Sequence, residues 1–227
     1  AEKVLLTHEV LVNGIVHPMP PELSFIEGAL AEPCSSVLAA HHKAGTSLDD
    51  TVLVIGAGPI GCLHIVVARA RGARVIVSQT SAPRRELARR FDPLAVIDPR
   101  SENLRERVLA LTGGLGADIV ICANPVAETQ AQAVEVVRKG GRVVLFGGLP
   151  KANPMTTLDG NRIHYGEIEV VGGFSYHPRF HRLALDMMQR GLLSADLVVT
   201  HTFSLDDIHA AFETAALGQG LKVMVTI

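Results

Sequence analysis

The sequence predicts an α/β fold in which a doubly wound parallel sheet of the Rossmann type forms one domain and both chain ends belong to another. Three observations indicate this fold. Short apolar runs alternate with segments of helical periodicity, the runs are continuously apolar, and a glycine-rich turn follows the first run. Strand, helix and strand repeated in this order predict right-handed crossovers between parallel neighbours.

Each apolar run is expected to be a strand because it is short and, in most cases, rich in Val and Ile. Continuous apolarity indicates burial on both faces, which is typical of parallel strands. The expected strands are Val52–Ile55, Arg74–Val77, Ala95–Ile97, Ile119–Cys122, Val143–Phe146 and Ile168–Val171.

The segments between these runs are expected to be helices. The first of them carries Ile60, His64, Ile65 and Ala68 at spacings that cover one helix face. Ser81 is an expected N-cap, and Gly140-Gly141 and Gly191 are expected just past helix ends. The expected helices are Pro59–Arg71, Pro83–Arg90, Leu104–Leu111, Ala127–Arg138 and Arg179–Arg190.

The two chain ends do not continue the alternation. The first 22 residues hold two strand candidates, KVLLT and IVHPMP, and the last 31 hold LVVTHTF, a helix from about Leu205 to Leu217, and the strand KVMVTI. We therefore expect residues 1–32 and 193–227 to belong to a second domain, and residues 33–192 to form the domain that contains the parallel sheet.

Composition excludes several classes of protein. The chain has 227 residues, of which 48% are hydrophobic and 19% charged, and its formal net charge is -2 with no basic block. Nucleic acid and acidic membrane surfaces are thus not expected partners. No apolar run reaches the roughly 20 residues that cross a bilayer, and no signal pattern is present, so we expect a cytoplasmic protein. Three well-separated cysteines are expected to be buried thiols.

A G-x-G-x-x-G turn carries the clearest functional signal. Gly56, Gly58 and Gly61 lie directly after the run VLVI and before a predicted helix. The first allows a tight turn, the second lets backbone approach a pyrophosphate, and the third lets the helix pack on the strand. The free N–H groups at the helix start favour phosphate. The pattern therefore predicts that residues 33–192 are a dinucleotide-binding domain.

The second expected strand ends in Ser78, Gln79 and Thr80, where NAD-binding proteins usually have an acid that bonds the ribose 2′-hydroxyl. Gln79 can bond a hydroxyl and does not repel a 2′-phosphate. Arg84 and Arg85 could pair with such a phosphate, although Arg85 is equally well explained as a solvated surface residue. The cofactor is expected to be NAD or NADP, with a slight preference for NADP.

Six stretches, in order, resemble the medium-chain, zinc-dependent dehydrogenases, and most closely their polyol branch of sorbitol and threonine dehydrogenase-like enzymes. They are ALAEPCSSVLAAHHKAG, VLVIGAGPIG, ADIVICANPVAETQAQAVEVVRKGGRVVLFGGLP, IHYGEIEVVGGFSY, FSLDDIHAAFE and LKVMVTI. The resemblance implies that a barrel-like catalytic domain accompanies the dinucleotide domain. It also implies that zinc polarises an alcohol or carbonyl oxygen while the nicotinamide exchanges hydride.

The resemblance also implies site residues. Glu32 matches the Glu of the family's Glu-Pro motif, a ligand of the catalytic zinc or a partner of its water; a buried or helix-start glutamate is the alternative. Tyr176 matches a substrate-facing position, but Ser175 replaces the Arg of a common Arg-Tyr pair, which weakens a polyol assignment. The expected cofactor-binding residues are Gly56, Gly58, Pro59, Ile60, Gly61, Ser78, Gln79, Thr80, Arg84, Ala123, Asn124, Phe146, Gly147, Phe174 and Ser175.

The chain departs from the family at its front. Only 31 residues precede Glu32, so the region with the family's Cys and Gly-His-Glu zinc motif is not present. Adjacent His41 and His42 would point about 100° apart on a helix and do not chelate. We therefore expect a fragment that binds cofactor but catalyses poorly, with zinc held by the intact parent and not by this chain alone.

Two functions follow from these observations. The first is part of an oxidoreductase that transfers hydride between NAD(P) and a secondary alcohol, polyol or ketone. The second is a binding module that holds NAD(P) without turnover. A zinc-free quinone-reductase-like protein is disfavoured by Glu32-Pro33. The apolar run Ile168–Val171 near the sheet edge predicts a homodimer or homotetramer.

Overall fold

The computed structural model describes residues 3–13, 16–218 and 220–227. The chain divides into two compact units. The larger unit is Ala39–Phe174, and the smaller unit joins the residues up to Leu38 with Ser175–Ile227. The domain boundaries expected from the sequence, 1–32, 33–192 and 193–227, remain a prediction.

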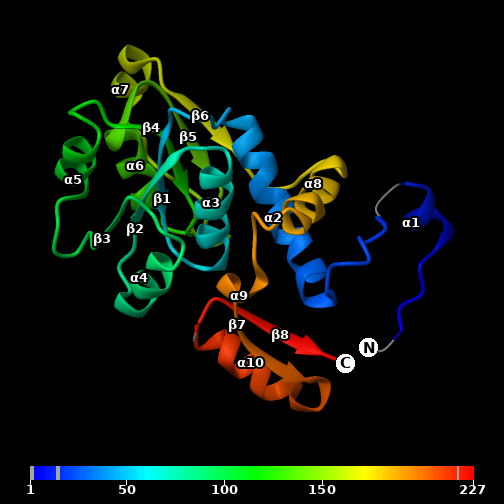
Figure 1. Cartoon of the computed structure of the whole chain (residues 1–227). Coiled ribbons are helices and arrows are strands. Elements are labelled where there is room, and N and C mark those ends of the chain that lie inside the picture. Colours follow the sequence, from blue (N-terminus) through cyan, green and yellow to red (C-terminus); the bar gives the residue numbers. More distant parts are fainter. Residues whose placement is uncertain (1–2, 14–15, 219) are drawn as a thin grey trace. The chain divides into compact units, whose positions relative to one another are not determined.

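The described residues of the larger unit form a six-stranded, wholly parallel sheet in the order β3-β2-β1-β4-β5-β6 (Figure 1). This order confirms the predicted doubly wound fold. The chain reverses direction across the sheet between β1 and β4, where α/β folds place their ligands. The strands are β1 (Thr51–Ile55), β2 (Arg74–Ser78), β3 (Ala95–Ile97), β4 (Ala117–Cys122), β5 (Val137–Leu145) and β6 (Glu169–Gly172).

Burial explains why the strands were predictable. Every residue of β1, TVLVI, is buried, and in β2 only Arg74 is exposed. A strand covered by helices on both faces excludes water from each side chain, so Val and Ile gain at every position. The register pairs Leu53 with Val120 and Ile55 with Cys122, and all four side chains lie in the same hydrophobic core.

The expected helices of the larger unit are confirmed within two residues at their ends. Asn103 caps the start of α5 by accepting a hydrogen bond from Glu106 N, whereas Ser81 occupies the cap position of α4 without a side-chain bond. Figure 1 shows α3 beside β1 and α6 beside β4. The helices are α3 (Pro59–Ala70), α4 (Ala82–Arg89), α5 (Leu104–Leu111), α6 (Ala127–Val136) and an unexpected α7 (Gly160–Gly166).

The expectation that Gly140-Gly141 ends a helix is wrong. Helix α6 ends at Val136, and both glycines lie inside β5. Gly140 has φ +65°, and the register between β4 and β5 shifts there, so the strand bulges. A bulge needs a residue that tolerates positive φ, as a helix C-terminus does, and the sequence signals are therefore alike.

Helix α2 (Phe25–Lys43) was not predicted, although it has 19 residues. Pro33 lies inside it, where a proline lacks the N–H that a helix interior uses for its hydrogen bonds. The hydroxyl of Ser36 donates to Pro33 O, and that of Ser35 donates to Ala31 O, so local side chains bond carbonyls around the proline. The helix contributes residues to both units.

The two strands expected at the amino-terminal end are wrong for the residues described. Residues 3–7 and 16–20 have no regular structure, and Ile15 lies outside the described residues. A short helix, α1 (His8–Val12), lies between them. Val4 is 77% exposed and Leu5 90% exposed, so strand-forming side chains here have no paired neighbour to make a sheet.

The carboxyl-terminal strand, helix and strand are confirmed. In the described part of the smaller unit, β7 (Val199–Ser204) and β8 (Lys222–Thr226) pair in parallel. The short η1 (Leu205–Asp207) and α10 (Ile208–Ala216) form the crossover between them. Two further helices, α8 (Arg179–Gln189) and α9 (Ala195–Val198), precede this pair, and Gly191 follows α8 with φ +69° as expected.

Candidate functional site

The loops that follow the strands of the larger unit meet at one edge of the sheet and contain most of the predicted cofactor residues. Each loop continues the strand pairing by one backbone bond. Gly56 N donates to Ser78 O at 2.9 Å, Ala123 N to Ile55 O at 2.9 Å, and Gly147 N to Cys122 O at 2.7 Å. Because the strands are parallel, these loops form a continuous rim of backbone around the point where the topology reverses.

The three glycines of the turn have different surroundings. Gly56 has φ +104°, a conformation that L side chains rarely adopt. A Cβ on Gly61 would lie 1.9 Å from Gly56 O, so α3 touches the turn here. A Cβ on Gly58 would meet only Arg84 Nη1 at 4.0 Å, and Gly58 has ordinary φ -75°. Local folding thus requires Gly56 and Gly61 but leaves the space over Gly58 open.

The loops after β4 and β5 are in equally close contact. A Cβ on Gly147 would lie 2.2 Å from Asn124 O. The Asn124 side-chain oxygen accepts from Thr129 Oγ1 at 2.7 Å and from Val126 N at 3.1 Å. Asn124 therefore organises the loop with its side-chain oxygen, which leaves mainly backbone of this segment to face a ligand.

Arg84 and Arg85, which the sequence both offered as partners of a 2′-phosphate, have different surroundings near the end of β2. Arg85 donates to Gln79 O at 3.0 Å and to Thr80 O at 2.8 Å, and it pairs with Asp98 at 2.8 Å. These bonds give Arg85 a structural role. Arg84, one residue earlier on α4, instead extends toward Gly58.

The side chain of Gln79 is fixed in one orientation. It is buried, and its Oε1 accepts from Thr80 N at 3.0 Å. The amide nitrogen is the donor end of this group, so a Gln79 held in this way presents N–H rather than an acceptor. Ser78, directly before it, is buried.

The remaining predicted residues lie at the boundary or in the smaller unit. Phe174 ends the larger unit and is 91% exposed. Glu32, Ser175 and Tyr176 belong to the smaller unit, where burial and then the charge of Glu32 and a hydrogen bond to it raise the pKa of Tyr176. Glu32 and Tyr176, predicted separately, are thus neighbours.

Two histidines that were not predicted as site residues lie beside this pair. Burial, followed by the charge of His17, lowers the pKa of His181, while the charge of Glu32 opposes that change. The rings of His17 and His181 stack with centroids 5.1 Å apart. No sequence pattern indicates this histidine pair, because its contacts join residues far apart in the chain.

The described residues do not fit a catalytic zinc ion. Among them, no group of three or more His, Cys, Asp or Glu side chains is arranged to hold a metal. Cys34, Cys62 and Cys122 are free and buried, as expected, and burial raises the pKa of each thiol to about 12. Protonated thiols are poor ligands, and a catalytic zinc takes about three protein ligands.

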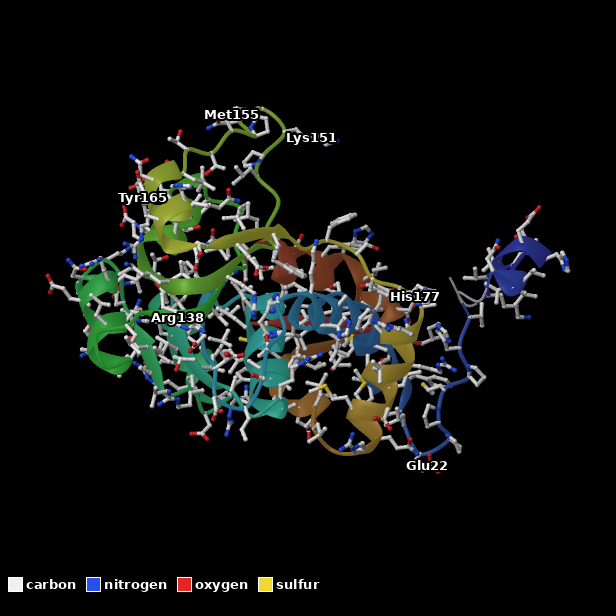
Figure 2. All side chains as sticks on the ribbon, turned by 90° about the horizontal axis from the view of Figure 1, so that it is seen from above. Glu22, Arg138, Lys151, Met155, Tyr165 and His177 are labelled. Atoms are coloured by element: carbon white, nitrogen blue, oxygen red, sulfur yellow. The ribbon has the colours of Figure 1, made fainter. Side chains whose placement is uncertain are left out.

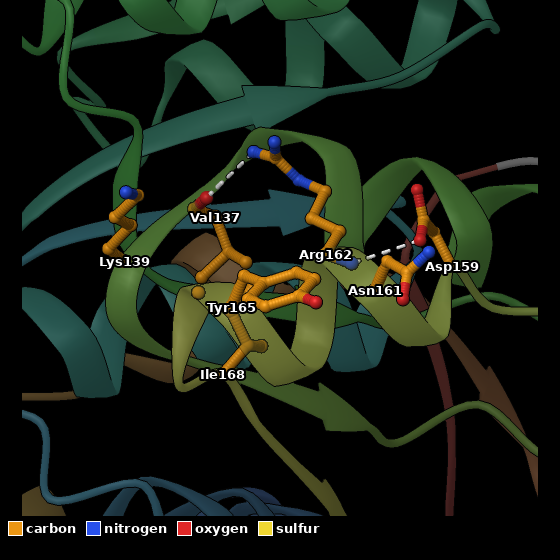
Figure 3. A pocket seen from close by; sticks show the side chains of 8 residues that line it. Val137, Lys139, Asp159, Asn161, Arg162, Tyr165 and Ile168 are labelled. Carbon is orange, nitrogen blue, oxygen red and sulfur yellow. Dashed lines mark hydrogen bonds between the residues drawn. The ribbon is translucent and has the colours of Figure 1, made fainter.

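A hollow of 320 Å³ lies at the amino ends of β5 and β6 (Figure 3). Arg162 donates there to the carbonyl of Val137, and Asp159 caps α7 through Arg162 N. Tyr165 and Met155, on the surface of the same unit, are about three-quarters exposed (Figure 2). None of the predicted cofactor residues lines this hollow.

Comparison with known families identifies the fold's relatives. A model described as "Zinc-binding dehydrogenase" matches residues 59–190, more than half of the chain. The chain belongs to the zinc-binding dehydrogenase family. The resemblance stated from sequence motifs is therefore confirmed, and the match covers α3 through α8.

Family relatives support the sorbitol dehydrogenase-like branch. The chain is 34% identical over 213 residues to sorbitol dehydrogenase of Macaca fascicularis and 30% identical over 213 residues to D-arabitol-phosphate dehydrogenase of Enterococcus avium. These matches cover 92% of this chain but only 58% and 60% of the relatives. The chain thus spans less than two thirds of their length.

Solved structures of the family share the fold. A structure from Sinorhizobium meliloti 1021, described as a zinc-binding dehydrogenase bound to NADP, has a TM-score of 0.85 and 31% identity. It matches 92% of this chain and 61% of its own. An alcohol dehydrogenase from Thermus sp. ATN1 has a TM-score of 0.86 and 27% identity, with coverage of 92% of this chain and 61% of its own.

None of the helices described here is long and apolar enough to cross a membrane.

Buried histidines in the larger unit predict that acid weakens the fold. Burial, then the charge of Arg71, lowers the pKa of His41 from 6.5 to about 3, and burial lowers that of His64 well below 6.5. Since the unfolded chain takes up these protons first, their contribution to stability is complete above pH 6.5 and is lost as pH falls toward 3. The free energy of unfolding should fall by up to about 1.4 kcal/mol per pH unit for each histidine.

Urea denaturation at pH 7, 6 and 5 measures this dependence. A double variant, His41→Leu with His64→Leu, should show a shallower decline because neither buried group remains to titrate. An equally steep decline in the double variant would contradict the assignment to this pair.

Proposed function

We propose that this chain is the NAD(P)-binding part of a zinc-dependent oxidoreductase that transfers hydride between a nicotinamide cofactor and a secondary alcohol, polyol or ketone. The observation that carries the proposal is the open space over Gly58 at the start of α3, between two glycines that the fold itself requires. A backbone concavity at a helix N-terminus is a site for a diphosphate.

We propose a position for each part of a dinucleotide at this site. The diphosphate lies against Gly56 to Gly61 at the topological switch point. One nucleoside lies toward β2, where Ser78, Gln79, Thr80 and Arg84 face it. The other lies over β4 and β5, with Ala123, Asn124, Phe146 and Gly147, and toward Phe174 and Ser175. When bound, the cofactor supplies the hydride-exchanging ring, and these residues bind and orient it.

We further propose a preference for NADP over NAD. Gln79 carries no charge, and its fixed orientation presents N–H donors at the end of β2. The Arg84 guanidinium, directed toward Gly58, is a bidentate donor for a phosphate. The structural relative described as bound to NADP is 31% identical to this chain.

We propose that the steps at the zinc and the substrate belong to the whole protein, of which this chain is a part. Glu32 and Tyr176 are neighbours in the smaller unit, and we propose that they face the zinc site and the substrate, respectively. The metal-ligating side chains described in this chain do not by themselves form a zinc site. The alternative, a binding module without turnover, is favoured if the natural protein oxidises no polyol while it binds NAD(P). A cytoplasmic location remains a prediction.

Replacing Gly58 tests the diphosphate site. Gly58→Ala should lower NADPH affinity about tenfold, or roughly 1.4 kcal/mol, because the methyl group occupies the space over the turn. Its free energy of unfolding should stay the same or rise by up to about 1 kcal/mol, since φ is -75° and the added Cβ meets no close atom. Isothermal titration and urea denaturation measure the two quantities.

Two matched glycine variants make the result specific. Gly160→Ala also adds a Cβ in open space, at the start of α7, and should change neither quantity. Gly61→Ala should lose about 2–3 kcal/mol of stability because of the contact with Gly56 O. Unaltered nucleotide affinity in Gly58→Ala would contradict the proposed site.

Replacing Arg84 tests the choice of cofactor. Arg84→Ala should weaken NADPH about tenfold more than it weakens NADH, because only NADPH offers a 2′-phosphate to the guanidinium, whereas both carry the diphosphate near Gly58. Arg89→Ala on the same helix removes an exposed arginine paired with Glu86 and should change neither affinity. Fluorescence titration with both cofactors gives the comparison. If Arg84→Ala leaves both affinities as they were, the nucleoside does not lie at the end of β2.

We propose that the protein forms a homodimer or homotetramer through the edge strand β6. This strand ends the sheet, and its residues Val170 and Val171 are only half-buried in the chain alone. An unpaired apolar edge favours pairing with a second copy. Sedimentation equilibrium should show a dimer or tetramer at micromolar concentration, and Val170→Lys should shift it to monomer. A protein that sediments only as a monomer would contradict this assembly.

A further inference from the structure

A chain of polar groups runs through the core of the larger unit, and the proposed function does not use it. His41, near the end of α2, and His64, in the middle of α3, are both fully buried. His64 Nδ1 lies 3.1 Å from His41 Nε2, and His41 Nδ1 lies 2.8 Å from Thr46 Oγ1. Thr46 N also donates to His41 O at 3.1 Å, which fixes the hydroxyl beside the ring.

The last nitrogen of this series of hydrogen-bonded groups, His64 Nε2, has no hydrogen-bond acceptor or donor among the described residues. His64 Nε2 is buried and makes no hydrogen bond to any residue in the described part of the chain. Its ring packs against Phe146 with centroids 4.6 Å apart and planes at 88°, an edge-to-face contact. A buried polar atom without a bond is unfavourable, so a core built only for packing would have an aliphatic side chain here.

The proton positions follow from charge and from the aromatic ring. Burial lowers the pKa of both histidines, and the cation that next disfavours a charge on His41 is Arg71, so both rings are neutral. In one arrangement Thr46 donates to His41, His41 donates to His64, and His64 Nε2 carries a proton. In the other arrangement, His64 donates to His41, His41 donates to Thr46, and His64 Nε2 carries a lone pair instead of a proton. The negative face of an aromatic ring favours the first arrangement.

We propose that His64 is a positioning residue whose Nε2–H donates to the face of the Phe146 ring, in a chain that begins at the Thr46 hydroxyl. The backbone of Phe146 is already fixed, because its N–H donates to Cys122 O at 3.2 Å. A Cβ on Gly173 would lie 3.2 Å from Phe146 Cδ2, so the ring also lies close to that glycine. His64 thus sets the orientation that the backbone leaves free.

The role of Phe146 links this chain of groups to ligand binding. Phe146 is half-buried at the carboxyl end of β5, on the β4–β5 side of the switch point. This inference rests on the proposed function, in which the adenosine lies toward β2 and the nicotinamide nucleoside toward β5. A ring held at this position contacts the nicotinamide half of the cofactor and not the adenosine half.

The test compares two ligands that differ only beyond the second phosphate and its ribose. NADH carries the nicotinamide, whereas ADP-ribose lacks it. His64→Leu should weaken NADH about two- to fivefold, the size expected for one N–H···π contact, and leave ADP-ribose affinity unchanged. The emission of bound NADH should also shift toward that of free NADH. His64→Gln, which keeps an N–H donor, should restore most of the NADH affinity.

A second pair of variants keeps both histidines in place. Thr46→Val removes the hydroxyl that fixes the tautomers and should weaken NADH in the same direction as His64→Leu, whereas Thr46→Ser should not. This pair provides the test if His64→Leu does not fold.

The outcomes separate this inference from the function on which it rests. Equal weakening of NADH and ADP-ribose would mean a purely structural role and would overturn the inference, as would unchanged affinity for both. In either case, binding of ADP-ribose by the unaltered chain would leave the proposed function standing. If the unaltered chain binds neither ligand, both proposals are wrong.

Discussion

The contact between Gly56 and Gly61 is the constraint on which the rest of the structure depends. A Cβ on Gly61 would overlap the Gly56 carbonyl at 1.9 Å, so α3 can start at this point only because no side chain is present. This approach sets the first turn of α3 directly over the end of β1. It therefore aims the helix's free N–H groups at the space where the sheet topology reverses.

A site built in this way consists mainly of backbone. The loops after β1, β4 and β5 bond one another through N–H and C=O groups, and Asn124 and Arg85 use their side chains to organise loops. Such a rim suits any dinucleotide. In the proposed function, Gln79 and Arg84 distinguish NADP from NAD, whereas Phe146 contacts the nicotinamide half that both cofactors share. In the proposed function, the backbone thus holds the diphosphate, and Gln79 and Arg84 set the specificity.

The sequence was sufficient for the sheet and for the glycine turn because both rest on local signals. Continuous Val and Ile runs predicted β1 to β6 in order, and three glycines predicted the turn. It was insufficient where distant residues decide. Helix α2 contains Pro33, and the hydroxyls of its serines bond the neighbouring carbonyls. Strand-forming residues such as Val4 have no neighbouring strand to pair with in the described part of the chain. His64 fits the apolar face of its helix, and no local pattern in the sequence indicates that it forms a hydrogen bond with His41, 23 residues away.

Chemical-shift mapping tests the central claim most directly. Backbone amide spectra of the labelled chain, recorded during titration with NADPH, report which N–H groups meet the ligand. The account predicts that the largest changes occur at Gly56 to Gly61, with Gln79 and Gly147 next. Unchanged amides in the glycine-rich turn, with the largest changes instead around the hollow beside α7, would contradict it.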